Sequence, residues 1–117
     1  MCSLFKAKDM GIDLMSMSSH KIYGPKGEGA LFMRKGLRIS NYIHGGAQEN
    51  SKRAGTENLT GIVGFGKAAE LARVNFDKHV QHCSELRNYL VDRILKEIPD
   101  TQLNGTMEGR HPRKHHL

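Results

Sequence analysis

Two short apolar segments separated by a polar turn constrain the fold of this chain most strongly. Residues 12–18 alternate apolar and polar side chains, as a half-buried strand does, and residues 29–34 form a second apolar segment. Residues 23–27 (Tyr-Gly-Pro-Lys-Gly) lie between them and combine a proline, which fixes one backbone dihedral, with glycines, which tolerate positive ones. Because this connection is short, we expect an antiparallel hairpin. Residues 39–43 could add a short third strand or an extended loop.

The apolar period changes to steps of three and four after residue 58. This spacing predicts one long helix, or two nearly continuous helices, over residues 59–98, ended by Pro99. The predicted apolar face comprises Ile62, Phe65, Ala69, Ala72, Phe76, Val80, Cys83, Leu86, Leu90, Ile94 and Ile98.

The start of this helix carries both a cap and several weak positions. Asn58 or Thr60 can accept a hydrogen bond from the first free backbone amides of the helix. Gly61, Gly64 and Gly66 each weaken the helix by roughly 1 kcal/mol relative to alanine. Because a glycine has no side chain, we expect these positions to permit close packing against a sheet.

The polar turn concentrates groups that bind phosphate around one lysine, Lys21, at the end of the first strand. A lysine amine can form an imine with the aldehyde of pyridoxal 5′-phosphate (PLP), while hydroxyls and basic groups hold the phosphate. In an extended chain Ser18 and His20 would point to the same side and could face one phosphate, whereas Ser19 would face away. From spacing alone, another interpretation stays open, in which Lys21 is an ordinary surface lysine and the nearby serine hydroxyls bond the local backbone.

Three motifs make the interpretation more specific. Residues 18–27 (Ser-Ser-His-Lys-Ile-Tyr-Gly-Pro-Lys-Gly) are followed by residues 44–49 (His-Gly-Gly-Ala-Gln-Glu) and residues 53–58 (Arg-Ala-Gly-Thr-Glu-Asn). In order and spacing they resemble the PLP-lysine segment and the following loops of cysteine desulfurases, within the class V aminotransferase family. The resemblance fades into ordinary helical sequence by about residue 74.

This resemblance assigns roles to four residues. It implies that Lys21 is the catalytic residue that carries PLP, and that Ser18 and His20 contact the phosphate of that cofactor. It further implies that Thr56 reaches the phosphate of the neighbouring subunit's cofactor, and therefore that the protein is a homodimer.

The resemblance also implies a fold class and a domain division. The fold would be α/β, a fragment of the large domain of a PLP-dependent transferase of fold type I, with strands plus a long C-terminal helix. Residues 1–58 would be the C-terminal part of the PLP-binding large domain, residues 59–98 the helix that links it to a small domain, and residues 99–117 a truncated start of that domain. Because the basic, histidine-rich residues 111–117 do not resemble the family, we expect a frameshift there, which the coding DNA can test.

The implied activity is the PLP-dependent removal of sulfur from L-cysteine, giving L-alanine and persulfide sulfur. The sulfur would pass to acceptor proteins of iron–sulfur cluster assembly or to tRNA thiolation. The resemblance places the family's sulfur-accepting cysteine, and the groups that hold the cofactor ring, outside residues 1–117, so we expect this chain alone to be inactive. A selenocysteine lyase or another class V aminotransferase could carry the same lysine segment and stays open.

Charge raises a different alternative, a small basic binding module. The net charge is +6 and the sequence pI is about 9.6, which nucleic-acid binding could explain. The positive residues are scattered, however, and only three tyrosines and four phenylalanines could stack on bases. A phosphate cofactor accounts better for Lys21, Lys26 and Arg53, so we do not expect a nucleic-acid partner.

The remaining signals concern compartment and metal. No apolar stretch approaches the length of a membrane span, and residues 1–6 do not form a signal peptide, so we expect a cytoplasmic protein with Cys2 and Cys83 reduced. His79 and Cys83 would share one helix face, but no third ligand has suitable spacing, and we expect no metal site.

Overall fold

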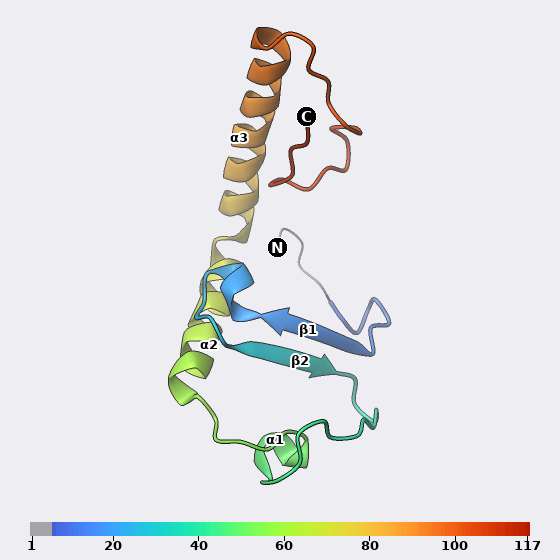
Figure 1. Ribbon diagram of the computed structural model, residues 1–117, viewed down its shortest axis with the longest axis vertical. Coiled ribbons are helices and arrows are strands. Elements are labelled where there is room, and N and C mark those ends of the chain that lie inside the picture. Colours follow the sequence, from blue (N-terminus) through green and yellow to red (C-terminus); the bar gives the residue numbers. More distant parts are fainter. Residues whose placement is uncertain (1–5) are drawn as a thin grey trace. The chain divides into compact units, whose positions relative to one another are not determined.

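The computed structural model describes residues 6–117, which form two compact units (Figure 1). The first unit, up to Ala72, contains strands β1 (Leu14–Ser18) and β2 (Gly29–Met33), the 3₁₀ helix η1 (Ser19–Ile22), and helix α1 (Gln48–Ser51). Helix α2 (Leu59–Val74) contributes most of its length to this unit, and helix α3 (Phe76–Glu97) belongs to the second.

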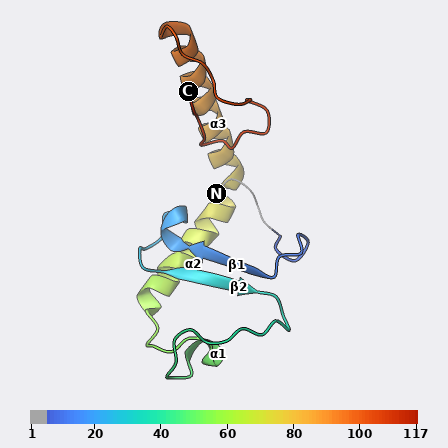
Figure 2. The same cartoon turned by 45° about the vertical axis from the view of Figure 1, so that its right-hand side comes forward.

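The two strands form the predicted antiparallel hairpin (Figure 2). Their register runs from Leu14 opposite Met33 to Ser18 opposite Gly29. Along β1, exposure alternates residue by residue, with every second side chain half-buried, as the apolar–polar alternation predicts. The side chain of Arg34 pairs with that of Asp13 at the open end of the hairpin.

The connection between the strands is more structured than a simple turn. The chain leaves the extended conformation at Ser19 and forms one turn of 3₁₀ helix, which ends at Tyr23 with a left-handed φ of 66°. The backbone N–H of Gly24 donates to the carbonyl of Ser19 at 3.0 Å, and the N–H of Ser19 donates to the carbonyl of Glu28 at 3.0 Å. The expectation that Ser18 and His20 follow one extended chain is therefore wrong, because His20 lies within η1.

Between β2 and α2 the chain is mostly irregular, and residues 39–43 are a loop rather than a third strand. Helix α1 is a single turn whose residues Glu49, Asn50 and Ser51 all have positive φ, between 51° and 61°. Ala54 is buried after this turn, and its N–H donates to the carbonyl of Ile43 at 3.4 Å.

Helix α2 begins at the predicted cap. The side-chain Oδ1 of Asn58 accepts a hydrogen bond from the N–H of Gly61 at 3.2 Å. The buried residues of α2 are Gly61 and Ala68, rather than the larger apolar residues of the predicted face, and Ile62 stays 44% exposed.

The glycines of α2 explain this difference. A Cβ at Gly61 would lie 2.5 Å from Cγ of Glu28, and a Cβ at Gly64 would lie 2.7 Å from Cγ of Pro25. Both contacts come from the turn between the strands, and packing of these glycines against the sheet itself stays a prediction. A Cβ at Gly66 would meet nothing within 4 Å.

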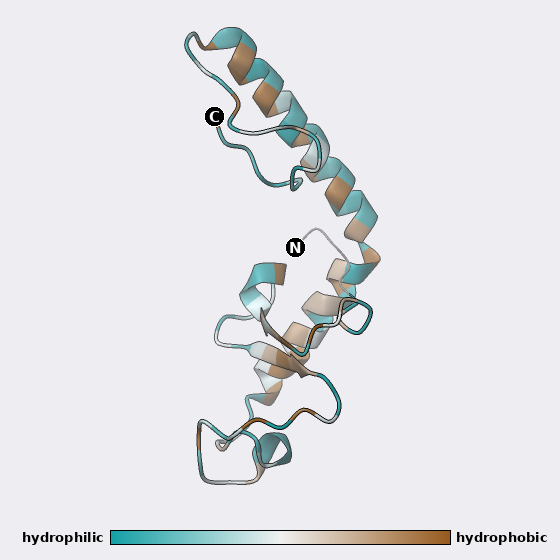
Figure 3. Cartoon of the chain, turned by 90° about the vertical axis from the view of Figure 1, so that its right-hand side faces the viewer, coloured by the Kyte–Doolittle hydropathy of each residue, from teal (hydrophilic) through white to brown (hydrophobic). Residues whose placement is uncertain are grey.

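The second unit contains α3 and the residues after it. Asn75 (φ −97°, ψ 12°) separates α2 from α3, so residues 59–98 form two helices, one of the two predicted arrangements. Apolar and polar residues alternate along α3 (Figure 3), and Val91 is its buried residue. The helix ends before Ile98, which is extended because it precedes Pro99.

Residues after Pro99 form turns and bends without a helix or strand. They are held to α3 by Arg87, whose Nη1 donates to the carbonyl of Arg110 at 3.0 Å and to that of His111 at 3.2 Å. In residues 6–117, no helix combines the length and the apolar composition needed to cross a membrane.

Replacing Gly64 and Gly66 separately by alanine tests the packing of α2. Gly66→Ala should raise the free energy of unfolding by about 1 kcal/mol, because alanine favours a helix and open space surrounds this position. Gly64→Ala should lower it by about 1–3 kcal/mol, since the rigid ring of Pro25 cannot move aside. Urea unfolding followed by circular dichroism compares the two variants. Equal stabilisation by both would contradict the contact between Pro25 and α2.

Candidate active site

Three predicted site residues lie together where β1 passes into η1. Ser18 is the last residue of β1, and His20 and Lys21 lie in η1. The side chains of all three are exposed. The site is therefore built on a strand end whose position the hairpin fixes, followed by a helical turn that changes the direction of the chain.

The side chains of these residues are available to a ligand. Ser18 is the N-cap residue of η1, with extended backbone angles (φ −117°, ψ 127°), but its hydroxyl makes no capping hydrogen bond. Within residues 6–117, neither His20 nor Lys21 forms a side-chain hydrogen bond or an ion pair. The alternative in which the Ser18 hydroxyl bonds local backbone is thus not what the structure adopts. A hydroxyl, an imidazole and an ammonium group within four residues suit a phosphate with an aldehyde attached nearby.

Thr56 lies apart from these three residues in the sequence, on the loop between α1 and α2, and is exposed. In the described part of the chain, no hydrogen bond connects it to Ser18, His20 or Lys21. The nearby guanidinium of Arg53 lies 4.0 Å from the position a Cβ would take at Gly55, whose φ is 114°. A role of Thr56 toward a neighbouring subunit stays a prediction.

The turn that follows the lysine is anchored to the start of α2. The side-chain Nδ2 of Asn58 donates to Oε1 of Glu28 at 2.6 Å, while Oδ1 of the same amide caps the helix through Gly61. Because Glu28 also accepts the N–H of Ser19 through its carbonyl, this link extends to the first residue of η1. The sequence predicts the cap at Asn58 but not its second bond, because that bond depends on the turn lying at the start of α2.

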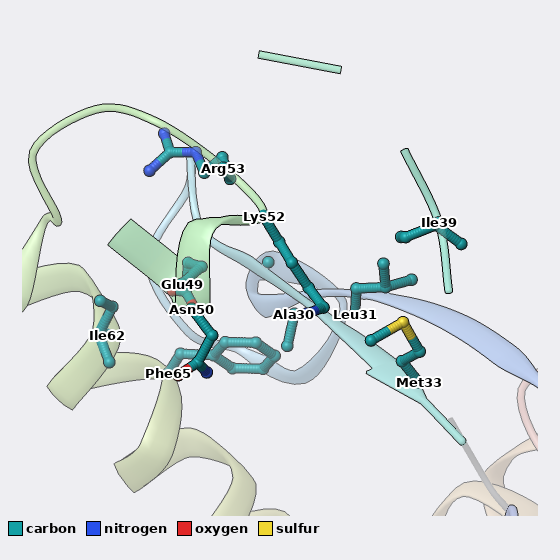
Figure 4. A pocket seen from close by; sticks show the side chains of 11 residues that line it. Ala30, Leu31, Met33, Ile39, Glu49, Asn50, Lys52, Arg53, Ile62 and Phe65 are labelled. Carbon is teal, nitrogen blue, oxygen red and sulfur yellow. The ribbon is translucent and has the colours of Figure 1, made fainter. Parts of the chain in front are cut away.

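A pocket of about 850 Å³ lies in the first unit (Figure 4). Its walls are mainly apolar and come from β2 and α2, including Leu31 and Phe65, and polar side chains of α1 and its C-terminal flank lie at one side. Figure 4 shows Lys52 extending toward β2. The pocket contains none of Ser18, His20, Lys21 or Thr56 among its lining residues. Sequence analysis did not predict it, because its walls come from segments far apart in the chain.

Cys83 belongs to the second unit, whereas the lysine site lies in the first. Cys2 lies outside the described residues. Cys83 is half-buried on α3, and its Sγ lies 3.6 Å from Nε2 of His79, so the two residues share a helix face as predicted. In the part of the chain that the structure describes, no group of three or more His, Cys, Asp or Glu side chains could hold a metal ion.

Comparison with known proteins identifies the family. The family model described as "Aminotransferase class-V" matches residues 4–115. The chain belongs to the class V aminotransferase family. This match covers nearly the whole sequence, so the α/β architecture of β1, β2 and the helices is part of a class V aminotransferase fold.

Curated class V relatives carry a more specific name. The chain is 54% identical over 104 residues to a protein named cysteine desulfurase IscS from Dictyoglomus turgidum, and the match covers 89% of this chain and 26% of that protein. It is 56% identical over 98 residues to a cysteine desulfurase IscS from Clostridium botulinum, covering 84% of this chain and 25% of that protein. The chain therefore spans about a quarter of the length of these relatives.

Solved structures confirm the predicted fold class, a fragment of a PLP-dependent transferase of fold type I. A NifS-like protein superposes with a TM-score of 0.85 at 36% identity, covering 92% of this chain and 29% of that one. A NifS-like protein from Rickettsia africae gives a TM-score of 0.86 at 33% identity, covering 95% of this chain and 31% of that one. A structure described as SspA in complex with cysteine is 48% identical with a TM-score of 0.52, covering 55% of this chain and 19% of that one.

The double role of Asn58 can be tested with a charge change. Asn58→Asp keeps a good helix cap but replaces the donor to Glu28 with a second carboxylate, so stability should fall by about 1 kcal/mol. The additional change Glu28→Gln should restore it, because the glutamine amide can donate to the new carboxylate. Urea unfolding at low and high salt measures both effects, and salt should reduce the deficit of the single variant.

A control separates the cap from the link. Asn58→Ser retains an oxygen that can cap α2 but introduces no charge, so its stability should not depend on salt. A deficit in Asn58→Asp that Glu28→Gln leaves unchanged would show that the link to Glu28 contributes nothing.

Proposed function

We propose that this chain is the lysine-bearing segment of a PLP-dependent cysteine desulfurase, with Lys21 as the residue that binds the cofactor covalently. The observation that carries the proposal is the unpaired group of Ser18, His20 and Lys21 at the β1–η1 junction, in a chain more than half identical to proteins named cysteine desulfurase. The lysine segment provides the chemistry, and the relatives indicate which class V reaction it serves.

The three residues fit the cofactor by the chemistry of their donors. When bound, PLP supplies an aldehyde that a lysine amine can attack and a ring that accepts electron density from the substrate. The Ser18 hydroxyl and the His20 imidazole would donate hydrogen bonds to phosphate oxygens. Lys21 is the residue after His20. Its Nζ atom would bond covalently to the aldehyde carbon and, once released, would accept and return a proton. Exposure of all three side chains leaves room for these contacts.

The remaining parts of the proposal extend beyond this chain. The hydroxyl of Thr56 would donate a hydrogen bond to the phosphate bound by a neighbouring subunit, which requires a homodimer. L-cysteine would be the substrate, in keeping with the cysteine complex of the similar SspA structure. The products would be L-alanine and a persulfide whose sulfur passes to acceptor proteins of iron–sulfur assembly or to tRNA thiolation, in the cytoplasm.

Covalent labelling tests the role of Lys21 directly. Incubation with PLP followed by borohydride reduction should place a pyridoxyl group on Lys21, identified by peptide mass spectrometry. Lys35 is an exposed turn lysine outside the site and serves as the matched control. Labelling of Lys21 should exceed that of Lys35 about tenfold, and Ser18→Ala should lower it, because one phosphate ligand is lost. Equal labelling of both lysines would overturn the proposal.

The activity itself is best tested in a full-length setting. We expect the 117-residue chain alone to release no alanine from L-cysteine, because the sulfur-accepting cysteine that the family uses is not among its matched motifs. A chimera that carries these residues within the 54% identical Dictyoglomus relative should release alanine. The same chimera with Lys21→Ala should be at least about a thousandfold slower, and with Lys35→Ala it should be unchanged. An inactive chimera that folds and is labelled at Lys21 would argue against L-cysteine as the substrate.

A further inference from the structure

Ser19 differs from every other residue of the lysine segment. Its side chain is 0% exposed, although Ser18, His20 and Lys21 on either side of it are exposed. It is the one side chain that is fully buried in the part of the chain that the structure describes. A buried serine between exposed site residues needs an explanation, because serine is usually a surface residue.

The hydroxyl of Ser19 does not account for its burial. Within residues 6–117, the Oγ atom is buried and has no hydrogen-bond partner. A buried hydroxyl without a partner destabilises a folded protein, because it has lost its hydrogen bonds to water. The hydroxyl is therefore not what favours this position, and the small volume of the side chain is the property that remains.

The surroundings of Ser19 are correspondingly tight. A Cβ at Gly24 would lie closer to Oγ of Ser19 than van der Waals contact allows, and it would lie 3.1 Å from Cβ of Ala68 on α2. Ala68 is itself buried. Three small residues from η1, the turn and α2 thus meet at one point, and each leaves room for the others.

The backbone of Ser19 joins the same elements. Its N–H donates to the carbonyl of Glu28, and its carbonyl accepts the N–H of Gly24, both at 3.0 Å. These two bonds define how η1 leaves β1 and returns into the turn. Because Lys21 lies two residues further along the same turn of helix, any displacement of Ser19 also moves the backbone that carries the lysine.

We propose that Ser19 is a positioning residue for Lys21. The small side chain of Ser19, and not its hydroxyl group, sets the distance of η1 from α2. This inference rests on the proposed role of Lys21. Ser19 touches neither substrate nor cofactor in this proposal. It acts through Gly24 and Ala68, which fix the helical turn on which the lysine stands.

A double-mutant cycle on the full chain tests this proposal, with labelling of Lys21 by PLP and borohydride as the readout. Ser19→Ala should change the rate of labelling by less than about twofold, because only the unpaired hydroxyl is removed. Gly24→Ala should reduce it at least about fivefold, since its methyl group collides with Oγ of Ser19. The double variant should recover to within about twofold of Ser19→Ala, because removal of Oγ makes room for the methyl group. If Gly24→Ala acted without a clash with Ser19, the double variant would be labelled as slowly as Gly24→Ala.

A second measurement keeps this inference separate from the proposed function. Hydrogen exchange at the Ser19 and Gly24 amides reports the position of η1 without any cofactor, and it should follow the same cycle. If wild-type Lys21 is labelled no faster than Lys35 while the exchange cycle holds, the proposed function fails and the packing role stands. If Ser19→Ala impairs labelling and exchange protection as much as Gly24→Ala does, the hydroxyl has a partner and the proposal is overturned. Absence of rescue in both measurements would also overturn it.

Discussion

The close approach between the turn at residues 24–28 and the first turns of α2 is the interaction on which the first unit depends. Gly61 and Gly64 leave backbone surface where any side chain would collide with Glu28 or Pro25. The side-chain amide of Asn58 then bonds Glu28 and caps α2 with its two polar atoms. A two-stranded hairpin is marginally stable by itself, so this contact gives β1 and β2 a helix against which to hold their geometry.

The lysine site follows from this packing. Ser19 is bonded to Glu28 and Gly24 through its backbone, so the contact that fixes the turn on α2 also fixes the start of η1. The exposed Lys21 lies in the short helix η1, whose first residue, Ser19, is buried. Such an arrangement suits covalent chemistry, because a reactive side chain needs a rigid support and an accessible end. Within residues 6–117, the side chains of its neighbours Ser18 and His20 have no hydrogen-bond partner either.

Several features of the fold could be predicted because they are local. Alternating residues in 12–18 and the Gly-Pro-Lys-Gly turn were sufficient for the hairpin, and Pro99 was sufficient for the end of α3. The motif around Lys21 was sufficient for the family, which the match over residues 4–115 confirms. The assumption that Ser18 and His20 follow one extended chain failed, because His20 lies in η1, which the hydrogen bond from the N–H of Gly24 to the carbonyl of Ser19 closes. The contacts of Gly61 with Glu28 and of Gly64 with Pro25 could not be predicted, because periodicity locates a helix face but not its neighbour.

The sequence by itself therefore determined the strands, the helical periods, the cap at Asn58 and the lysine motif with its family. These depend on residues near one another in the chain, whose turn and helix preferences act locally. Only the tertiary structure decided that Ser19 is buried, that Gly24 lies against it, and that Glu28 bonds Asn58. The physical reason is that burial and steric fit depend on which distant segments meet. Small residues such as serine, glycine and alanine form no local sequence pattern from which their contacts could be predicted.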